Sequence, residues 1–345
     1  MRGRAGSAAD RESPAGPTPQ ATLYQPAVDE PVVDEPTVDE PTVDEHCRRR
    51  PAEPLRPYVA YYTGYRQRGV PPARHRGLPS PFLTLIFTLD EPLVMLAHPD
   101  PRQPPGDFGA LLGGLHSAPA LITHDGAQSG IQVALRPLGA RALLGLPAGE
   151  LAELDLPAET VLGGACAELR ARTVAATSWP ERFAILDEIL LRRAGAGPGL
   201  AGPGPAGPVR SAGIAPSPAP EVAWAWRQLL ASGGTVRIAD LAAGTGWSGR
   251  HLTGRFRTEI GLTPKAAARV IRFDRARHLL IRHARSISGD DGDDGYRLAD
   301  LAVACGYFDQ AHLAREFRSL AGCPPSQWLT EEVSQRGRDL AWTEE

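Results

Sequence analysis

Residues 237–256 read RIADLAAGTGWSGRHLTGRF, and residues 297–317 repeat this pattern as RLADLAVACGYFDQAHLAREF. In both stretches a glycine precedes an aromatic residue, and a leucine and a phenylalanine four positions apart follow. Each copy closes on a further glycine, with a proline three residues later. The offset between the copies is 60 residues up to the aromatic and 61 from the leucine onward. The chain therefore contains one supersecondary unit twice, with one extra residue in the turn of the second copy.

The spacing of apolar residues predicts two helices around a tight turn in each copy. Ile238, Leu241 and Ala242 fall on one face of a short helix, because they lie three and four positions apart. Gly246 can end that helix as a left-handed cap, and Ser248 can cap a second helix whose leucine and phenylalanine turn inward. Helix, tight turn and helix form a helix-turn-helix motif, whose second helix can lie in the major groove of DNA.

These residues resemble the AraC/XylS-type transcriptional regulators, whose members carry two such motifs joined by a long helix. The resemblance covers about residues 221–330, and its most specific segment is GYFDQAHLAREFRSLAGCPPSQW at 306–328. The connector also fits, because Thr263 can cap and Pro264 can begin a helix that continues over 265–283. The resemblance implies a sequence-specific DNA-binding transcriptional regulator that reads successive major-groove segments with two recognition helices.

The candidate DNA-binding residues lie on the outward faces of the two second helices and at their caps. By similarity to the family, base-reading positions fall at Arg250, Thr253 and Gly254, and at Gln310, Ala311 and Arg315. Arginine suits guanine and glutamine suits adenine, whereas Gly254 and Ala311 depart from the polar types usual there. An ordinary solvated helix face is the alternative interpretation, above all for the two histidines. The full set is Ser248, Arg250, His251, Thr253, Gly254, Arg257, Asp309, Gln310, Ala311, His312 and Arg315.

The distribution of charge agrees with a nucleic-acid partner although the whole chain has a net charge of −3. Residues 221–330 carry 15 Lys/Arg and 11 Asp/Glu, and four of those acids lie in the loop at 286–295. Residues 21–45 carry eight acids and no base. The helix-turn-helix part is therefore basic, as phosphate contacts require.

The remaining sequence divides the chain into an α+β protein of two domains. Residues 1–50 form an acidic, Pro-rich tail that we expect to be disordered, because a proline every fifth residue and repelling acids prevent packing. Residues 51–193 read as a β-rich, cupin-like sensor or effector domain with trailing helices. A Gly/Pro-rich linker at 194–220 leads to an all-α double helix-turn-helix domain at 221–330, and a tail occupies 331–345.

Composition indicates a bacterial, cytoplasmic protein. Neither an apolar run long enough for a transmembrane helix nor a signal peptide is evident in the sequence. The four cysteines are widely spaced, which favours reduced thiols in or near a core. Beyond double-stranded DNA, the candidate partners are RNA polymerase, a small-molecule effector and a second copy of the chain, and no membrane partner is expected.

An enzyme is the alternative function. Four histidines in the β-rich half could hold a metal in a cupin-type barrel fused to a DNA-targeting module: His75, His98, His116 and His124. Their spacing matches no ligand motif, and nucleophile-elbow and phosphate-loop patterns are absent from the sequence. We therefore expect no enzymatic activity, no catalytic residue, no metal site and no cofactor.

Overall fold

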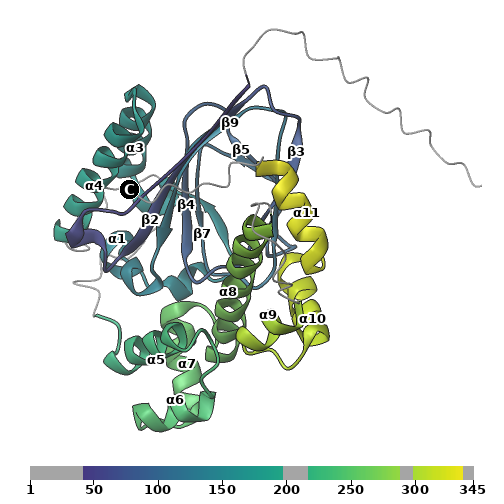
Figure 1. Ribbon diagram of the computed structural model, residues 1–345. Helices are drawn as coiled ribbons and strands as arrows, with labels where there is room; N and C mark the ends of the chain where they lie inside the picture. The colour runs from purple at the N-terminus through teal and green to yellow at the C-terminus, as the bar shows by residue number, and fades with distance from the viewer. Residues whose placement is uncertain (1–41, 197–216, 288–297, 337–345) are drawn as a thin grey trace, which may run out of the picture. The chain divides into compact units, whose positions relative to one another are not determined.

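The N-terminal half of the protein is built on two antiparallel sheets (Figure 1). The computed structural model describes residues 42–196, 217–287 and 298–336. Within these residues the larger sheet has the order β1-β2-β9-β4-β7-β10, formed by Val43–Arg49, Val59–Arg68, Gln128–Leu135, Leu83–Thr88, Ala110–Gly113 and Asp155–Pro157. The smaller sheet has the order β3-β8-β5-β6, formed by Ala73–Gly77, Ala120–His124, Leu93–Ala97 and Gly106–Phe108.

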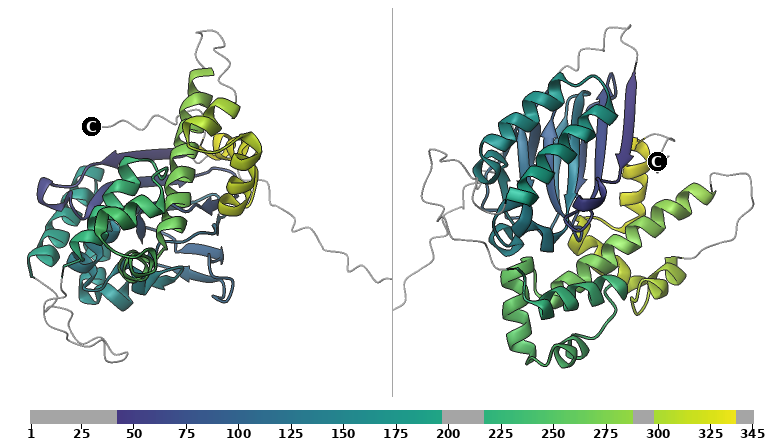
Figure 2. Two further views of the ribbon diagram at one scale, coloured as in Figure 1. Left: turned by 90° about the horizontal axis from the view of Figure 1, so that it is seen from below. Right: turned by 90° about the vertical axis from the view of Figure 1, so that its left-hand side faces the viewer.

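Helices cover one face of the larger sheet. α3 (Gly164–Ala175) and α4 (Trp179–Ala196) lie against it (Figure 2, right), and both contribute to the apolar core that contains Phe87 and Val133. Short elements complete this half of the chain: η1 (Glu53–Leu55), η2 (Pro137–Gly139), α1 (Ala140–Leu144), η3 (Ala148–Leu151) and α2 (Glu159–Leu162). The β-rich N-terminal domain with trailing helices that the sequence predicted is confirmed.

The C-terminal part is entirely helical. Its elements are α5 (Pro220–Ala231), α6 (Ile238–Thr245), α7 (Gly249–Ile260), α8 (Pro264–Ile287), α9 (Leu298–Ala304), α10 (Gln310–Ala321) and α11 (Pro325–Arg336). Leu252 and Phe256 of the first copy and Leu313 and Phe317 of the second are fully buried in the same hydrophobic cluster. The two copies therefore share one core, to which α8 contributes Phe273.

The predicted turn chemistry is present in both copies. Gly246 and Gly306 have φ angles of 69° and 78°, in the left-handed region that favours glycine. Gly306 also needs its lack of a side chain, because a Cβ there would stand 2.5 Å from Thr235 Cγ2 of the first copy. The long connecting helix begins as expected, since the backbone N–H of Ala266 donates to Thr263 Oγ1 at 3.2 Å. Local sequence signals thus suffice for this domain.

The predicted end of the N-terminal tail at residue 50 is wrong. Residues 1–41 lie outside the described part of the chain, but Val43–Arg49 form β1, which pairs along its whole length with β2. The acids of this strand have partners: Asp44 accepts a hydrogen bond from Gln67, and Glu45 accepts one from the Trp179 indole. The sheet therefore accommodates these two acids, although the sequence around them resembles the acidic, Pro-rich repeat before it, which was expected to be disordered.

Two further predicted boundaries shift. α4 continues to Ala196 rather than ending at 193, and residues 197–216 of the predicted linker lie outside the described part. α11 continues to Arg336, past the predicted domain end at 330, while residues 337–345 are again outside it. From Glu40 onward the chain forms one compact unit. Among the described helices, none has both the length and the apolarity needed to cross a membrane.

Candidate nucleic-acid interface and cavity

The first recognition helix, α7, presents a polar face to solvent. It begins at its predicted cap, where the backbone N–H of His251 donates to Ser248 Oγ at 3.2 Å. Arg250, Gly254 and Arg257 are exposed along this helix. Thr253 is half-buried, and its hydroxyl donates to the Gly249 carbonyl at 2.7 Å. The hydroxyl can therefore only accept a hydrogen bond from another molecule.

The second recognition helix, α10, repeats this arrangement. The backbone N–H of His312 donates to the Asp309 carboxylate at 2.6 Å, which makes Asp309 the cap that the sequence predicted. Gln310, Ala311 and Arg315 are exposed. The extra residue of the second turn is Phe308, whose side chain is 87% exposed immediately before the cap.

The two histidines of the candidate set have the same structural contact. The His251 ring packs edge-on against Trp247, with centroids 4.6 Å apart, and the His312 ring packs edge-on against Tyr307 at 5.3 Å. His312 Nδ1 also accepts a hydrogen bond from the Phe308 backbone N–H. Both rings thus brace the turn of their motif, which favours the structural interpretation of these residues over base contact.

Three exposed arginines of the recognition helices differ in their pairing from most of the other arginines that the structure describes. Arg250, Arg257 and Arg315 form no ion pair or hydrogen bond with any residue that the structure describes. By contrast, Arg269 on α8 pairs with Glu316 at 2.7 Å, and Arg141 holds Glu259 through two bonds of 2.7 and 2.8 Å. The guanidinium groups on the outward faces are therefore available to an anionic partner.

The C-terminal end of α7 contacts the N-terminal half of the chain. Glu259 is only 6% exposed. Its carboxylate accepts hydrogen bonds from Arg141 and thereby raises the pKa of the Arg141 guanidinium. A Cβ at Gly149 would stand 2.1 Å from the Thr258 carbonyl, so glycine permits close approach of η3 to this helix. The first recognition helix is thereby attached to the β-rich domain by a nearly buried ion pair.

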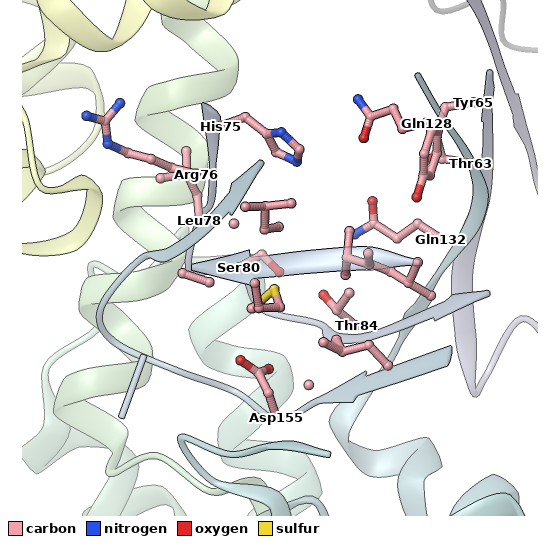
Figure 3. A pocket seen from close by; sticks show the side chains of 18 of the residues that line it. Thr63, Tyr65, His75, Arg76, Leu78, Ser80, Thr84, Gln128, Gln132 and Asp155 are labelled. Carbon is pink, nitrogen blue, oxygen red and sulfur yellow. The ribbon is translucent and has the colours of Figure 1, made fainter. Parts of the chain in front are cut away.

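A cavity of about 250 Å³ is present in the β-rich domain, lined from both sheets (Figure 3). Its residues come from strands far apart in the sequence, among them Thr63 on β2, Met95 on β5 and Gln132 on β9. The sequence analysis did not identify these residues. The usable signal was the alternation of polar side chains at Thr63, Tyr65 and Gln67, which share one face of a strand because side chains alternate between faces.

The four histidines considered as metal ligands do not form a metal site in the described residues. His75, His116 and His124 line the cavity, and the His75 and His124 rings lie 6.2 Å apart. His98 is buried and its Nδ1 lies 2.8 Å from Asp155 Oδ2. No group of three or more His, Cys, Asp or Glu side chains in the described ranges could hold a metal ion.

Comparison with protein families assigns the C-terminal helices to a class. Residues 241–331 match the family described as a helix-turn-helix domain, and residues 48–157 match a domain of unknown function, DUF6597. The C-terminal part is thus a helix-turn-helix domain, the class of module that binds DNA. More particularly, it is of the AraC type, which confirms the resemblance seen in the sequence.

Solved structures of AraC-family regulators are similar to the chain at low sequence identity. The C-terminal domain of AraT, a response regulator from Geobacillus stearothermophilus, is 19% identical with a TM-score of 0.28, covering 33% of this chain and 88% of that one. ToxT from Vibrio cholerae is 11% identical with a TM-score of 0.44, covering 78% and 96%. ToxT with an unsaturated fatty acid bound is 10% identical with a TM-score of 0.43, covering 82% and 97%. No curated protein matches the sequence.

Proposed function

We propose that this protein is a sequence-specific transcriptional regulator that places α7 and α10 in two successive segments of the DNA major groove. The observation that carries the proposal is the pair of exposed recognition-helix faces whose arginines have no protein counter-charge among the described residues. Arg250 and Arg315 suit guanine O6 and N7, and Gln310 suits adenine. We assign Arg257 to a phosphate contact, because it lies nine residues, about two and a half helical turns, beyond the cap Ser248 and so farther along its helix than Arg250 or Arg315.

The helix-turn-helix class supports this function because its second helix docks in the major groove through residues near its N-terminus. In both copies that end is fixed by a side-chain cap, and the leucine and phenylalanine of the helix are anchored in a common core. The polar faces are therefore held rigidly with respect to each other. A rigid pair of helices suits a bipartite site in which two base-pair blocks lie about one helical turn apart.

We also propose that the β-rich domain binds a small-molecule effector in its cavity. The cavity is lined from both sheets, as is common for ligand sites between packed layers. The Arg141–Glu259 ion pair connects the same domain to α7, and this gives a physical route by which effector binding could alter DNA binding. RNA polymerase and a second copy of the chain stay predictions from the sequence.

Selection of bound duplexes from a random pool, with the full-length chain, tests the DNA-binding proposal. We expect an enriched site with two blocks about 10 base pairs apart. Affinity for it should fall steeply with salt, since released counterions drive binding. The matched control replaces Arg250, Arg257 and Arg315 by Ala and should enrich nothing. Failure of the wild-type chain to bind any duplex at low salt would refute the proposal.

A further inference from the structure

The larger sheet presents two chemically different faces. In β4 and β9, Leu85 and Val133 point into the apolar core beneath α3 and α4, whereas their neighbours Thr84 and Gln132 line the cavity. The space between two packed sheets is normally filled by apolar side chains, because polar groups there lose water. A polar inner face in this position indicates that the cavity holds a partner with polar groups.

Four polar side chains on this wall have no hydrogen-bond partner among the residues that the structure describes. They are Thr63, which is only 7% exposed, and Tyr65, Thr84 and Gln132. Figure 3 shows these four side chains among those that line the cavity. Burial raises the pKa of Tyr65, so its phenol stays protonated and can donate a hydrogen bond. Thr63 is buried, and Tyr65, Thr84 and Gln132 are half-buried against the cavity, so the polar groups of all four can bond to a molecule that occupies it.

Three of these side chains, Thr63, Tyr65 and Gln132, lie next to one another and form a hydrogen-bonding edge along the cavity. Thr63 and Gln132 face each other directly in the β2–β9 register. Tyr65 faces Gly130, where a Cβ would stand 2.5 Å from the phenol oxygen, so glycine lets the hydroxyl lie over β9 beside Gln132. A hydroxyl donor, a hydroxyl of either role and a carboxamide are thus presented side by side. The Gln132 carboxamide can both donate to and accept from a second amide.

Two neighbouring glutamines are already engaged and hold the rest of the wall in place. Gln128 Nε2 donates to Gln67 Oε1 at 2.6 Å, and Gln67 Nε2 donates to Asp44 Oδ1 at 2.9 Å. This chain of bonds reaches β1, so Gln67 and Gln128 are not free to replace Gln132 as the binding group. The hydrogen-bonding edge therefore centres on Gln132.

Part of the opposite wall of the cavity is apolar, although His75 and Arg76 of β3 and His124 of β8 line it too. The smaller sheet contributes Leu93, Met95 and Ile122, which are buried and pack together with Ile86 and Leu111 of the larger sheet. A ligand in this cavity would meet hydrogen-bonding groups along one edge and hydrocarbon across its face. A polyhydroxylated ligand fits this division poorly, because hydroxyls against the apolar wall would be left unsatisfied.

The ionisable side chains that line the cavity already have partners within the protein. Arg76 pairs with Glu331, Arg277 with Asp274 at 2.7 Å, and the Asp155 carboxylate lies 2.8 Å from His98 Nδ1. His46 Nδ1 lies 3.3 Å from the Asp44 carboxylate, His116 Nδ1 lies 2.6 Å from the Ala118 carbonyl, and the His75 ring packs against His124. Burial lowers the pKa of His124, which favours its neutral form. An ionic ligand would have to break one of these pairs or remain unpaired in a poorly solvated site, so a neutral ligand is favoured.

We propose that the cavity binds a small neutral molecule with a planar apolar body and a carboxamide or lactam edge, and that Gln132, Thr63 and Tyr65 recognise that edge. The volume of about 250 Å³ lies just below the usual range for drug-sized ligands, which limits the body to one or two rings. This inference deepens the proposed effector site and rests on it. The Gln132 carboxamide binds the amide edge through one donated and one accepted hydrogen bond.

Matched amide and acid probes test the ligand class on the full-length chain. Benzamide, nicotinamide and δ-valerolactam are titrated by calorimetry and by thermal shift, alongside benzoate and nicotinate. We expect at least one amide to bind and to raise the melting temperature, and its matched acid to bind about 100-fold more weakly, because a desolvated carboxylate finds no free cation. If no amide binds, or if the acids bind as tightly, the assignment is wrong.

Variants of Gln132 and Thr63 test the recognising residues. Gln132→Leu and Thr63→Val should each weaken amide binding roughly tenfold or more, without lowering the melting temperature of the ligand-free protein, because an unsatisfied polar group is replaced by an apolar one. Gln132→Asn and Thr63→Ser keep the chemistry and should retain part of the affinity. Unchanged amide binding in Gln132→Leu would overturn the role of Gln132.

The affinity of the ligand-free chain for its selected duplex, measured in parallel, separates this inference from the proposed function. Intact DNA binding without amide binding overturns the ligand class alone. Amide binding by a chain that binds no duplex supports the ligand class and overturns the DNA-binding proposal.

Discussion

The two helix-turn-helix copies agree in their scaffold and differ in their exposed residues. Leu252 and Phe256 have buried counterparts in Leu313 and Phe317, and both turns use a left-handed glycine. Once the extra residue Phe308 is allowed for, the exposed positions diverge. Arg250 corresponds to Ala311, and Gly254 corresponds to Arg315. The first helix thus carries its candidate base-reading arginine in its first turn and the second helix carries it one turn later, so one scaffold presents two different reading surfaces.

The largest expected effect concerns the shared core. Phe256→Ala and Phe317→Ala each remove a fully buried ring, and each should lower the free energy of unfolding by about 3–5 kcal/mol. Because both rings belong to one cluster, each variant should unfold all the C-terminal helices in a single calorimetric transition. A variant in which one copy melts early while the other keeps its wild-type melting temperature would show that the cores are independent.

Base recognition should separate the two copies. Arg250→Ala and Arg315→Ala should each weaken binding to the selected duplex by about 1–3 kcal/mol, and each should relax preference at a different base pair. Competition binding against single-base variants of the duplex measures this. Arg102→Ala, an exposed arginine of the β-rich domain, is the control and should change nothing. An equal loss on all sequences would instead assign the arginine to a phosphate.

The caps should differ in strength. Asp309→Ala should cost about 1–2 kcal/mol and Ser248→Ala about half of that, because the Asp309 bond is shorter and charge-assisted. Chemical denaturation of both variants measures the difference. Asp309→Ser keeps a neutral cap, so its stability should lie between that of the wild type and that of Asp309→Ala. An Asp309→Ala loss no greater than that of Ser248→Ala would contradict this ranking.

The smallest expected effect is at Gly254. A Cβ there would meet nothing within 4 Å, so Gly254→Ala should stabilise the protein by about 0.5–1 kcal/mol through helix propensity. Melting temperature and duplex affinity are measured on the same sample. Stabilisation with weaker binding would mean that the bare backbone approaches DNA closely, and stabilisation with undiminished affinity would mean that glycine is merely tolerated.

The sequence predicted the helical domain well because its signals are local. Caps, glycine turns and apolar residues three and four positions apart, such as Leu241 and Ala242 after Ile238, act within one or two turns of helix. The β-rich domain was predicted only in part, since the sequence indicated its class and its trailing helices but not the order of its strands, and β1 was assigned to the tail. β2 (VAYYTGYRQR) hides its pattern because its inward residues Thr63, Tyr65 and Gln67 are polar.

The cavity was beyond sequence analysis for a related reason. Gln132 meets Thr63 across 69 residues of sequence, and only the strand order β2-β9-β4 brings them together. The candidate DNA-binding residues lie where the sequence put them, on two exposed helix faces and at two caps. What the sequence did not reveal is the internal engagement of His251 and His312, which depends on the tertiary position of the preceding aromatic.

The shared core has a mechanical consequence for any duplex that both helices engage. Arg269 and Phe273 of α8 contact the second copy, Arg272 donates to the Gly234 carbonyl beside the first, and Gly306 touches Thr235. A module braced in this way holds its two helices at a fixed separation, so a bound duplex that does not already match that separation has to deform. Bending a site of this length costs about 1–6 kcal/mol, depending on its stiffness. Base steps that neither helix touches would then influence affinity through their flexibility.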